Sequence, residues 1–297
     1  MKRQDPFSAY HPLVTFLYFV LVLVCTMCLL HPVSLVISLA GALCYRAALK
    51  GKENFGKGFR FVLPVALMAA ICNALFGHKG ATILFQLPTG SVTLESMIFG
   101  LSSGLMLSAV MVWFGCYSEV MTSDKFIFLF GRITPSLSLV LSMTLSFIPR
   151  FKKQFAVVAQ TQQSMGRSIS EGKLKQRIKR GVKILSIMIT WSLENAIETA
   201  DSMKSRGYGL PNRSTFSVYR FDGRDKLALF WLVLCGVVVL AGWAVGAISW
   251  NYYPLFTCSL TEPVTIGSQI IYLALCMTPI MLRVKEDRKW RSFKSTN

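Results

Sequence analysis

Charged side chains are scarce in this chain of 297 residues, and acidic ones are scarcer than basic ones. Only 15% of the residues are charged, whereas soluble domains average about 25%. The apolar residues gather in long uncharged runs, which include 13–30, 61–77, 227–253 and 265–282. Runs of about 18 apolar residues are long enough to cross a bilayer as helices. The scarcity of charge therefore excludes a soluble globular domain and predicts an all-α, polytopic membrane protein.

The chain also lacks the short motifs that carry catalysis or nucleotide hydrolysis. It has no GxxxxGK[ST] phosphate loop, no GxSxG nucleophile motif and no HExxH zinc motif. Its three histidines are scattered, and the CxxC pair Cys25 and Cys28 lies in an uncharged run where packed thiols are the better explanation. We therefore expect no catalytic residue, no cofactor and no metal site. Any ATP-driven work needs a separate ATPase.

The positions of lysine and arginine predict which segments cross the membrane. The predicted spans are 13–30, 33–49, 61–77, 97–116, 227–248 and 265–282. With these six spans, all of the 32 lysines and arginines except Lys79 fall on the same side as both termini. The positive-inside rule makes that side cytoplasmic. It also accounts for the net charge of +18 without a nucleic-acid partner.

A further crossing at 126–148 is apolar enough to consider, but it conflicts with the charges. It would move the very basic segment 150–183 to the other side, and Arg132 would lie within the span. We therefore predict that 126–148 forms two amphipathic pieces that do not cross. The connection 82–94 alternates apolar and polar residues, which predicts a small hairpin that turns at 87–90.

These predictions divide the chain into four parts. They are a four-helix transmembrane region at 1–117, a cytoplasmic region of long amphipathic helices at 118–226, a two-helix transmembrane region at 227–283, and a basic cytoplasmic tail at 284–297.

Two long helices are predicted in the middle part. Apolar residues recur at steps of three and four from Leu137 to Met165, so we expect one amphipathic helix that ends near Gly166 and is kinked but not ended by Pro149. After the basic stretch 173–183, a second helix is expected from about Val182 to Ser205. Its predicted apolar stripe comprises Leu185, Ile189, Leu193, Ile197, Ala200 and Met203, and its stop signals are Gly207, Gly209 and Pro211.

Each predicted helix ends at an arginine beside a glycine, Arg167 beside Gly166 and Arg206 beside Gly207. Arginine forms forked pairs with carboxylates, and glycine lets a partner backbone approach. These ends are therefore candidate docking points for a partner. Basic residues at helix C-termini also complement the helix dipole, so residue types alone leave both interpretations open.

Three acidic side chains share one side of the second helix: Glu194, Glu198 and Asp201. They are interpreted as solvated partners of nearby cations. The alternative is a membrane-embedded, metal-dependent enzyme that uses these three carboxylates. A second alternative, a stand-alone secondary carrier, predicts charged residues within the spans, and the four long uncharged runs contain none.

The middle part resembles the transmembrane T component (EcfT, CbiQ-like) of energy-coupling factor transporters from about residue 134 to 214. The resemblance rests on Phe147-Ile148-Pro149-Arg150, on Gln160 and Gln163 before Met165-Gly166-Arg167, on 202–208 (SMKSRGY), and on Arg213-Ser214. The second motif retains Arg206-Gly207 intact, with Ser205 in place of the family's alanine. The first has its arginine after the glycine.

The resemblance implies an ATP-driven importer of a vitamin or a metal ion in the plasma membrane of a prokaryote. Two ABC ATPase subunits hydrolyse ATP, a small membrane S component captures the solute, and the T component couples them within the lipid bilayer. The resemblance also implies that Ser205, Arg206, Gly207, Met165, Gly166 and Arg167 dock the ATPases. It assigns supporting positions in the coupling helices to Pro149, Arg150, Met203, Tyr208 and Arg213.

Overall fold

The computed structural model describes residues 6–51, 53–77, 82–87, 90–131, 135–166, 173–208, 219–246, 248, 250–252, 257–258 and 263–295. The chain forms two compact units. The first contains residues 1–126 and 219–297, and the second contains residues 127–218.

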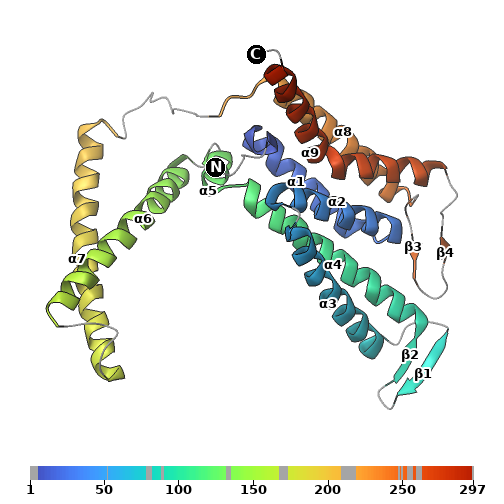
Figure 1. Cartoon of the computed structure of the whole chain (residues 1–297), viewed down its shortest axis with the longest axis horizontal. Helices are drawn as coiled ribbons and strands as arrows, with labels where there is room; N and C mark the ends of the chain where they lie inside the picture. The colour runs from blue at the N-terminus through green and yellow to red at the C-terminus, as the bar shows by residue number, and fades with distance from the viewer. Residues whose placement is uncertain are drawn as a thin grey trace. The chain divides into compact units, whose positions relative to one another are not determined.

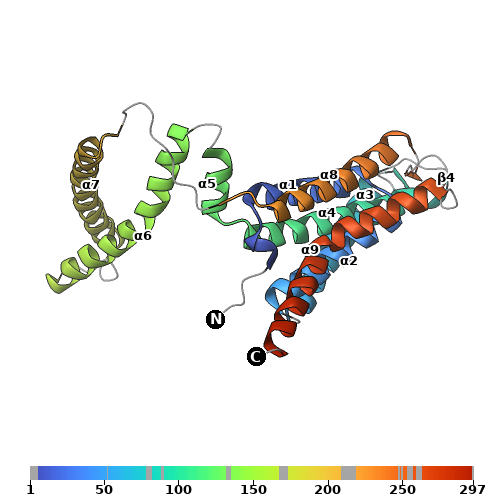
Figure 2. The ribbon, with the colours of Figure 1, turned by 90° about the horizontal axis from the view of Figure 1, so that it is seen from above.

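The first unit is a bundle of helices (Figure 1). Its helices are η1 (Pro6–Ala9), α1 (Pro12–Cys28), α2 (Pro32–Lys50), α3 (Glu53–Phe76), α4 (Leu94–Val120), α8 (Gly223–Ala244) and α9 (Pro263–Ser295). A short helix, α5 (Ser123–Gly131), follows α4 across the boundary between the units. Helix α9 packs along both α2 and α8, and Figure 2 shows α9 and α2 running side by side.

The polytopic all-α class is confirmed. Among the described residues, four helices are long and apolar enough to cross a membrane: Pro32–Leu49, Leu94–Val120, Gly223–Ala244 and Pro263–Lys285. Two shorter apolar helices, Pro12–Cys28 and Val62–Asn73, coincide with the first and third predicted spans. Helix α9 continues as one helix through Ser295, so it includes most of the predicted basic tail at 284–297.

Two short hairpins join helices of this unit. Strands β1 (Ile83–Leu87) and β2 (Gly90–Thr93) pair antiparallel, with Leu87 opposite Gly90, which confirms the predicted hairpin between α3 and α4. The turn residues 88–89 lie outside the described residues. Strands β3 (Trp250–Asn251) and β4 (Thr257–Cys258) form a second antiparallel pair between α8 and α9.

A buried polar network ties four helices of the bundle together. The Thr26 hydroxyl of α1 lies 2.8 Å from the Ser38 hydroxyl of α2 and 3.0 Å from the Tyr272 hydroxyl of α9. The Trp113 indole of α4 donates to the same Ser38 oxygen at 3.0 Å. Hydrogen bonds between helices stabilise membrane bundles because each buried polar group needs a partner there.

Replacing Thr26 with valine tests this network. We expect the T26V chain to lose about 1 kcal/mol of stability, because Ser38 and Tyr272 each lose a partner while the side-chain volume is kept. In detergent this should lower the midpoint of thermal unfolding by about 2–4 °C. The matched control is T278V, since the Thr278 hydroxyl donates to the Ala274 carbonyl of its own helix at 2.9 Å. Equal shifts in the two variants would contradict the network.

Small residues let α3 and α4 approach closely. A Cβ atom built on Gly100 would lie 2.7 Å from the Asn73 Cβ. One built on Gly104 would lie 2.7 Å from the Ala66 Cα. Membrane helices use such small residues at interfaces because the backbones then gain van der Waals contact. Only glycine therefore fits at positions 100 and 104 of α4 without pushing α3 and α4 apart.

The second unit contains α6 (Pro135–Ser164) and α7 (Leu174–Ser205), which pack against each other. The break between α5 and α6 agrees with the prediction that 126–148 contains two pieces. Pro149 lies within α6 without ending it, as expected. Helix α7 begins at Leu174 and not near Val182, so the basic stretch is helical. Gly181 within it costs only about 1 kcal/mol relative to alanine, which packing of the helix offsets.

Candidate functional site

The C-terminal end of α7 is built by its glycine. Gly207 has φ of 73°, the left-handed conformation that glycine adopts without strain. The Gly207 N–H donates to the Lys204 carbonyl at 2.9 Å, and the Tyr208 N–H donates to the Met203 carbonyl at 3.0 Å. These two bonds define a Schellman motif, which satisfies carbonyls that the last turn leaves without partners. Arg206 is thereby fixed as the last residue before the chain leaves the helix axis.

The side chains at this end are open to their surroundings. Arg206 is exposed, and Tyr208 is 51% exposed. The Ser205 hydroxyl turns back to its own helix and donates to the Asp201 carbonyl at 2.9 Å. Met203 is half-buried. The α7 end therefore presents a guanidinium and an aromatic ring on either side of a glycine, an arrangement suited to bind an acidic surface with some apolar contact.

The C-terminal end of α6 has the same type of glycine. Gly166 has φ of 71°, and its N–H donates to the Gln163 carbonyl at 2.9 Å. Among the described residues, a Cβ built on Gly166 would meet nothing within 4 Å. Met165, beside it, is 56% exposed. The prediction that α6 ends here is confirmed.

The two motifs differ in the order of their residues when their left-handed glycines are aligned in the sequence. In the sequence, Met165 precedes Gly166 as Arg206 precedes Gly207, and Arg167 follows Gly166 as Tyr208 follows Gly207. The first motif thus has its apolar residue before the glycine and its arginine after it, whereas the second has the reverse. Arg167 and Arg213 lie outside the described residues, so their part in the site stays a prediction.

Packing between α6 and α7 sets the positions of both ends. The Phe147 and Trp191 rings stack with centroids 5.6 Å apart, and Phe151 lies 6.5 Å from the same indole. Ile184 and Met188 of α7 are each only 1% exposed. Figure 1 shows the helices crossing, with their C-terminal ends at different ends of the pair. Pro149 and Arg150 are exposed on α6, one turn from this aromatic contact.

The face of α7 that packs against α6 is not the stripe expected from the sequence. Ile184, Met188 and Trp191 lie on that face, whereas the predicted stripe residues Leu185 and Ile189 are more than half exposed. The exposed stripe begins earlier than expected. It comprises Leu174, Ile178, Val182, Leu185, Ile189, Leu193 and Ile197. The sequence therefore predicted the C-terminal part of this stripe, from Leu185 onward, but not its beginning at Leu174.

The metal-dependent enzyme alternative depends on three acidic residues of α7. Glu194, Glu198 and Asp201 are all exposed. Within the part of the chain that the structure describes, no three His, Cys, Asp or Glu side chains come together as a metal site would require. The geometry therefore gives the metal-dependent enzyme no support in these residues.

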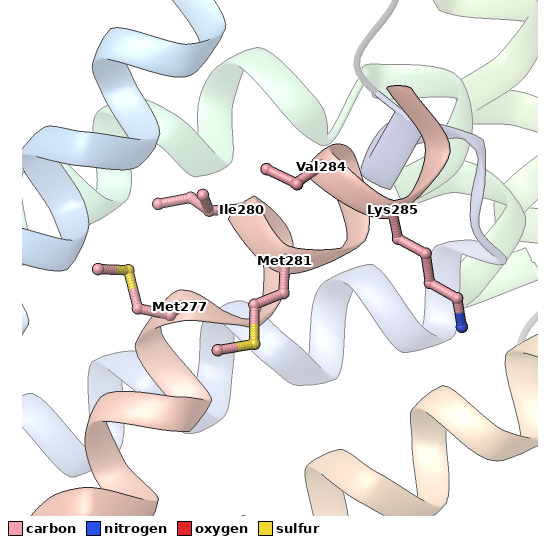
Figure 3. Close-up of a pocket in the computed structure, with 5 residues that line it drawn as sticks. All are labelled: Met277, Ile280, Met281, Val284 and Lys285. Atoms are coloured by element: carbon pink, nitrogen blue, oxygen red, sulfur yellow. The ribbon is translucent and has the colours of Figure 1, made fainter. Parts of the chain in front are cut away.

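Two hollows of the described residues lie in the first unit. One, of about 460 Å³, follows a single face of α9 and is lined by Met277, Ile280, Met281, Val284 and Lys285. Figure 3 shows the Lys285 amine extending away from Met277 and Ile280. A second, of about 250 Å³, lies between α2 and α9, and its walls are mainly aliphatic. Neither hollow is lined by a predicted site residue.

Comparison with known proteins points to one kind of membrane protein. The chain is 25% identical to the energy-coupling factor transporter transmembrane protein EcfT of Bacillus selenitireducens, over 72% of this chain and 82% of the relative. It is 24% identical to the EcfT protein of Lactococcus lactis subsp. cremoris, over 81% and 92% of the two chains. It is 27% identical to EcfT 1 of Listeria monocytogenes, over 63% and 74%. No family model matches the chain.

Proposed function

Because this chain belongs to the family of energy-coupling factor transporter transmembrane proteins, we propose that it is the T component of an ATP-driven importer of a vitamin or a metal ion. In this proposal two ABC ATPase subunits bind the chain, and a small membrane S component captures the solute. The chain sits in the plasma membrane of a prokaryote with both termini in the cytoplasm. Residues 118–226 act as the coupling region between the transmembrane parts 1–117 and 227–283.

The observation that carries the proposal is the pair of exposed helix ends on α6 and α7. Each end has a left-handed glycine, and the two ends lie at different ends of one crossing pair. Such an arrangement suits two separate partners of the same kind, one at each end. The absence of a phosphate loop means that the energy must come from those partners.

The docking residues in this proposal are Ser205, Arg206 and Gly207 for one ATPase and Met165, Gly166 and Arg167 for the other. ATP-dependent closure of the ATPases would bring the two ends toward each other. The crossing helices would transmit that motion to the S component through the C-terminal part of the exposed apolar stripe of α7, where Leu193 and Ile197 need a partner to cover them.

Co-purification tests the proposal directly. The chain is solubilised from its native membrane, captured, and analysed by mass spectrometry. We expect two ABC ATPase subunits and a small hydrophobic protein to co-purify with it. The reconstituted complex should take up its solute only when ATP is supplied. Solute uptake by the chain alone without ATP would instead identify a secondary carrier and overturn the proposal.

A further inference from the structure

Helix α7 changes character halfway along its length. Its first twenty residues, 174–193, contain five lysines and arginines and no acidic residue, whereas Glu194, Glu198 and Asp201 follow within the next eight. The exposed apolar stripe runs through both halves. The first half therefore combines an apolar stripe with cations alone, and the second half combines it with anions.

The cations of the first half are placed beside the stripe. Lys175, Lys179 and Lys183 recur every four residues, so they form a row along one side of the helix. Each follows a stripe residue by one position, and all three are exposed. The stripe residues here are Leu174, Ile178, Val182, Leu185 and Ile189, and each is between 51% and 73% exposed. The other side of the stripe adjoins the face that packs on α6.

The local electrostatics of this segment favour an anion beside it. The first turn of α7 has no acidic residue, and Lys173 at the N-cap makes no side-chain hydrogen bond to the helix. Cations near a helix N-terminus oppose the helix dipole, since that end is itself positive. A row of amines at this end is therefore stabilised by an anionic surface that lies along it.

We propose that the first half of α7 lies on an anionic lipid surface, with its apolar stripe at the level of the acyl-chain boundary and its lysine row among the phosphates. Apolar residues on one face and lysines beside them are the signature of helices that lie in a membrane interface. Each lysine adds attraction to anionic lipids. The bilayer in which the other helices of the same chain are embedded supplies this lipid surface to α7 at a high effective concentration.

An acidic protein surface is the competing partner, and the composition of the segment favours lipid. The stripe is a continuous aliphatic surface, which suits contact with acyl chains. The lysines have long flexible side chains, so their amines reach the lipid head groups even when the helix axis lies below them. The contact is separate from ATPase docking at Arg206, because the lysine row and Arg206 lie at opposite ends of α7.

Hydrogen exchange measured by mass spectrometry on the full chain in nanodiscs tests this contact. One set of nanodiscs contains only zwitterionic lipid, and in the other about a third of the lipids are anionic. We expect amides of 176–186 to exchange at least about tenfold more slowly in the anionic nanodiscs. Amides of 194–205 should be unchanged and serve as an internal control. High salt should remove most of the difference.

Matched triple variants separate charge from folding. Replacing Lys175, Lys179 and Lys183 with glutamine keeps the helix propensity and should abolish the lipid difference. The variant E194Q/E198Q/D201N should retain it. Equal exchange of 176–186 in both lipids would overturn the proposal. The proposal would also be overturned if 176–186 were unprotected in both nanodiscs and became protected only when soluble polyglutamate is added. That result would identify an acidic protein as the partner of this segment.

Discussion

Replacement of Arg206 by glutamate is expected to abolish co-purification of one ATPase subunit and to stop ATP-driven uptake. The side chain is exposed at the last turn of α7, so a docked partner desolvates it and must supply an anion to pair with it. Reversing the charge of one member of such a pair costs about 2–5 kcal/mol, or about thirtyfold or more in affinity. The measurement is the amount of ATPase retained per chain, together with uptake by proteoliposomes.

The folded state should tolerate this change. Gly207, not Arg206, carries the left-handed conformation, and Arg206 has φ of −84° and ψ of 7°. A glutamate at the helix C-terminus opposes the dipole by only about 0.3–1 kcal/mol. The docking loss therefore exceeds any effect on α7 itself. Lys153→Glu, an equal charge reversal at an exposed position of α6, is the matched control and should leave assembly intact. If the Arg206→Glu variant retains the ATPase normally, Arg206 does not dock the ATPase.

The sequence predicted those parts of the fold that single residues or long runs decide. Uncharged runs located the spans, because the bilayer requires a minimum apolar length. Gly166 and Gly207 marked both helix ends, because few other residues adopt a left-handed conformation there.

The parts that depend on packing could not be predicted. The second helix was expected to begin near Val182, after the basic stretch, yet α7 begins at Leu174 and runs through that stretch. The periodicity contained two apolar faces, Leu185 with Ile189 and Ile184 with Met188. Only the contact with α6 decides which of them is buried.

Replacement of Gly104 by leucine is expected to prevent α3 and α4 from packing, with loss of most of the monodisperse, folded protein. The Cβ alone would lie 2.7 Å from the Ala66 Cα, 2.9 Å from the Ala66 carbonyl oxygen and 2.9 Å from the Ala69 Cβ. Two of these atoms belong to the backbone of α3, so no rotamer change relieves the contact. The helices must separate, and the bundle then loses close packing that lipid does not replace. Yield after size-exclusion chromatography and the thermal midpoint in detergent measure the effect.

Gly115 of the same helix provides the matched control. A Cβ at Gly115 would meet nothing within 4 Å, so the leucine variant there adds the same apolar volume at an open position. We expect normal yield and an unchanged or slightly higher thermal midpoint, since leucine is the better helix former. If both leucine variants fold equally well, the close approach of α3 and α4 is wrong. If both fail, leucine is poorly tolerated anywhere on α4. If only the Gly104 variant fails to fold, the steric contact with Ala66 is the cause of its instability.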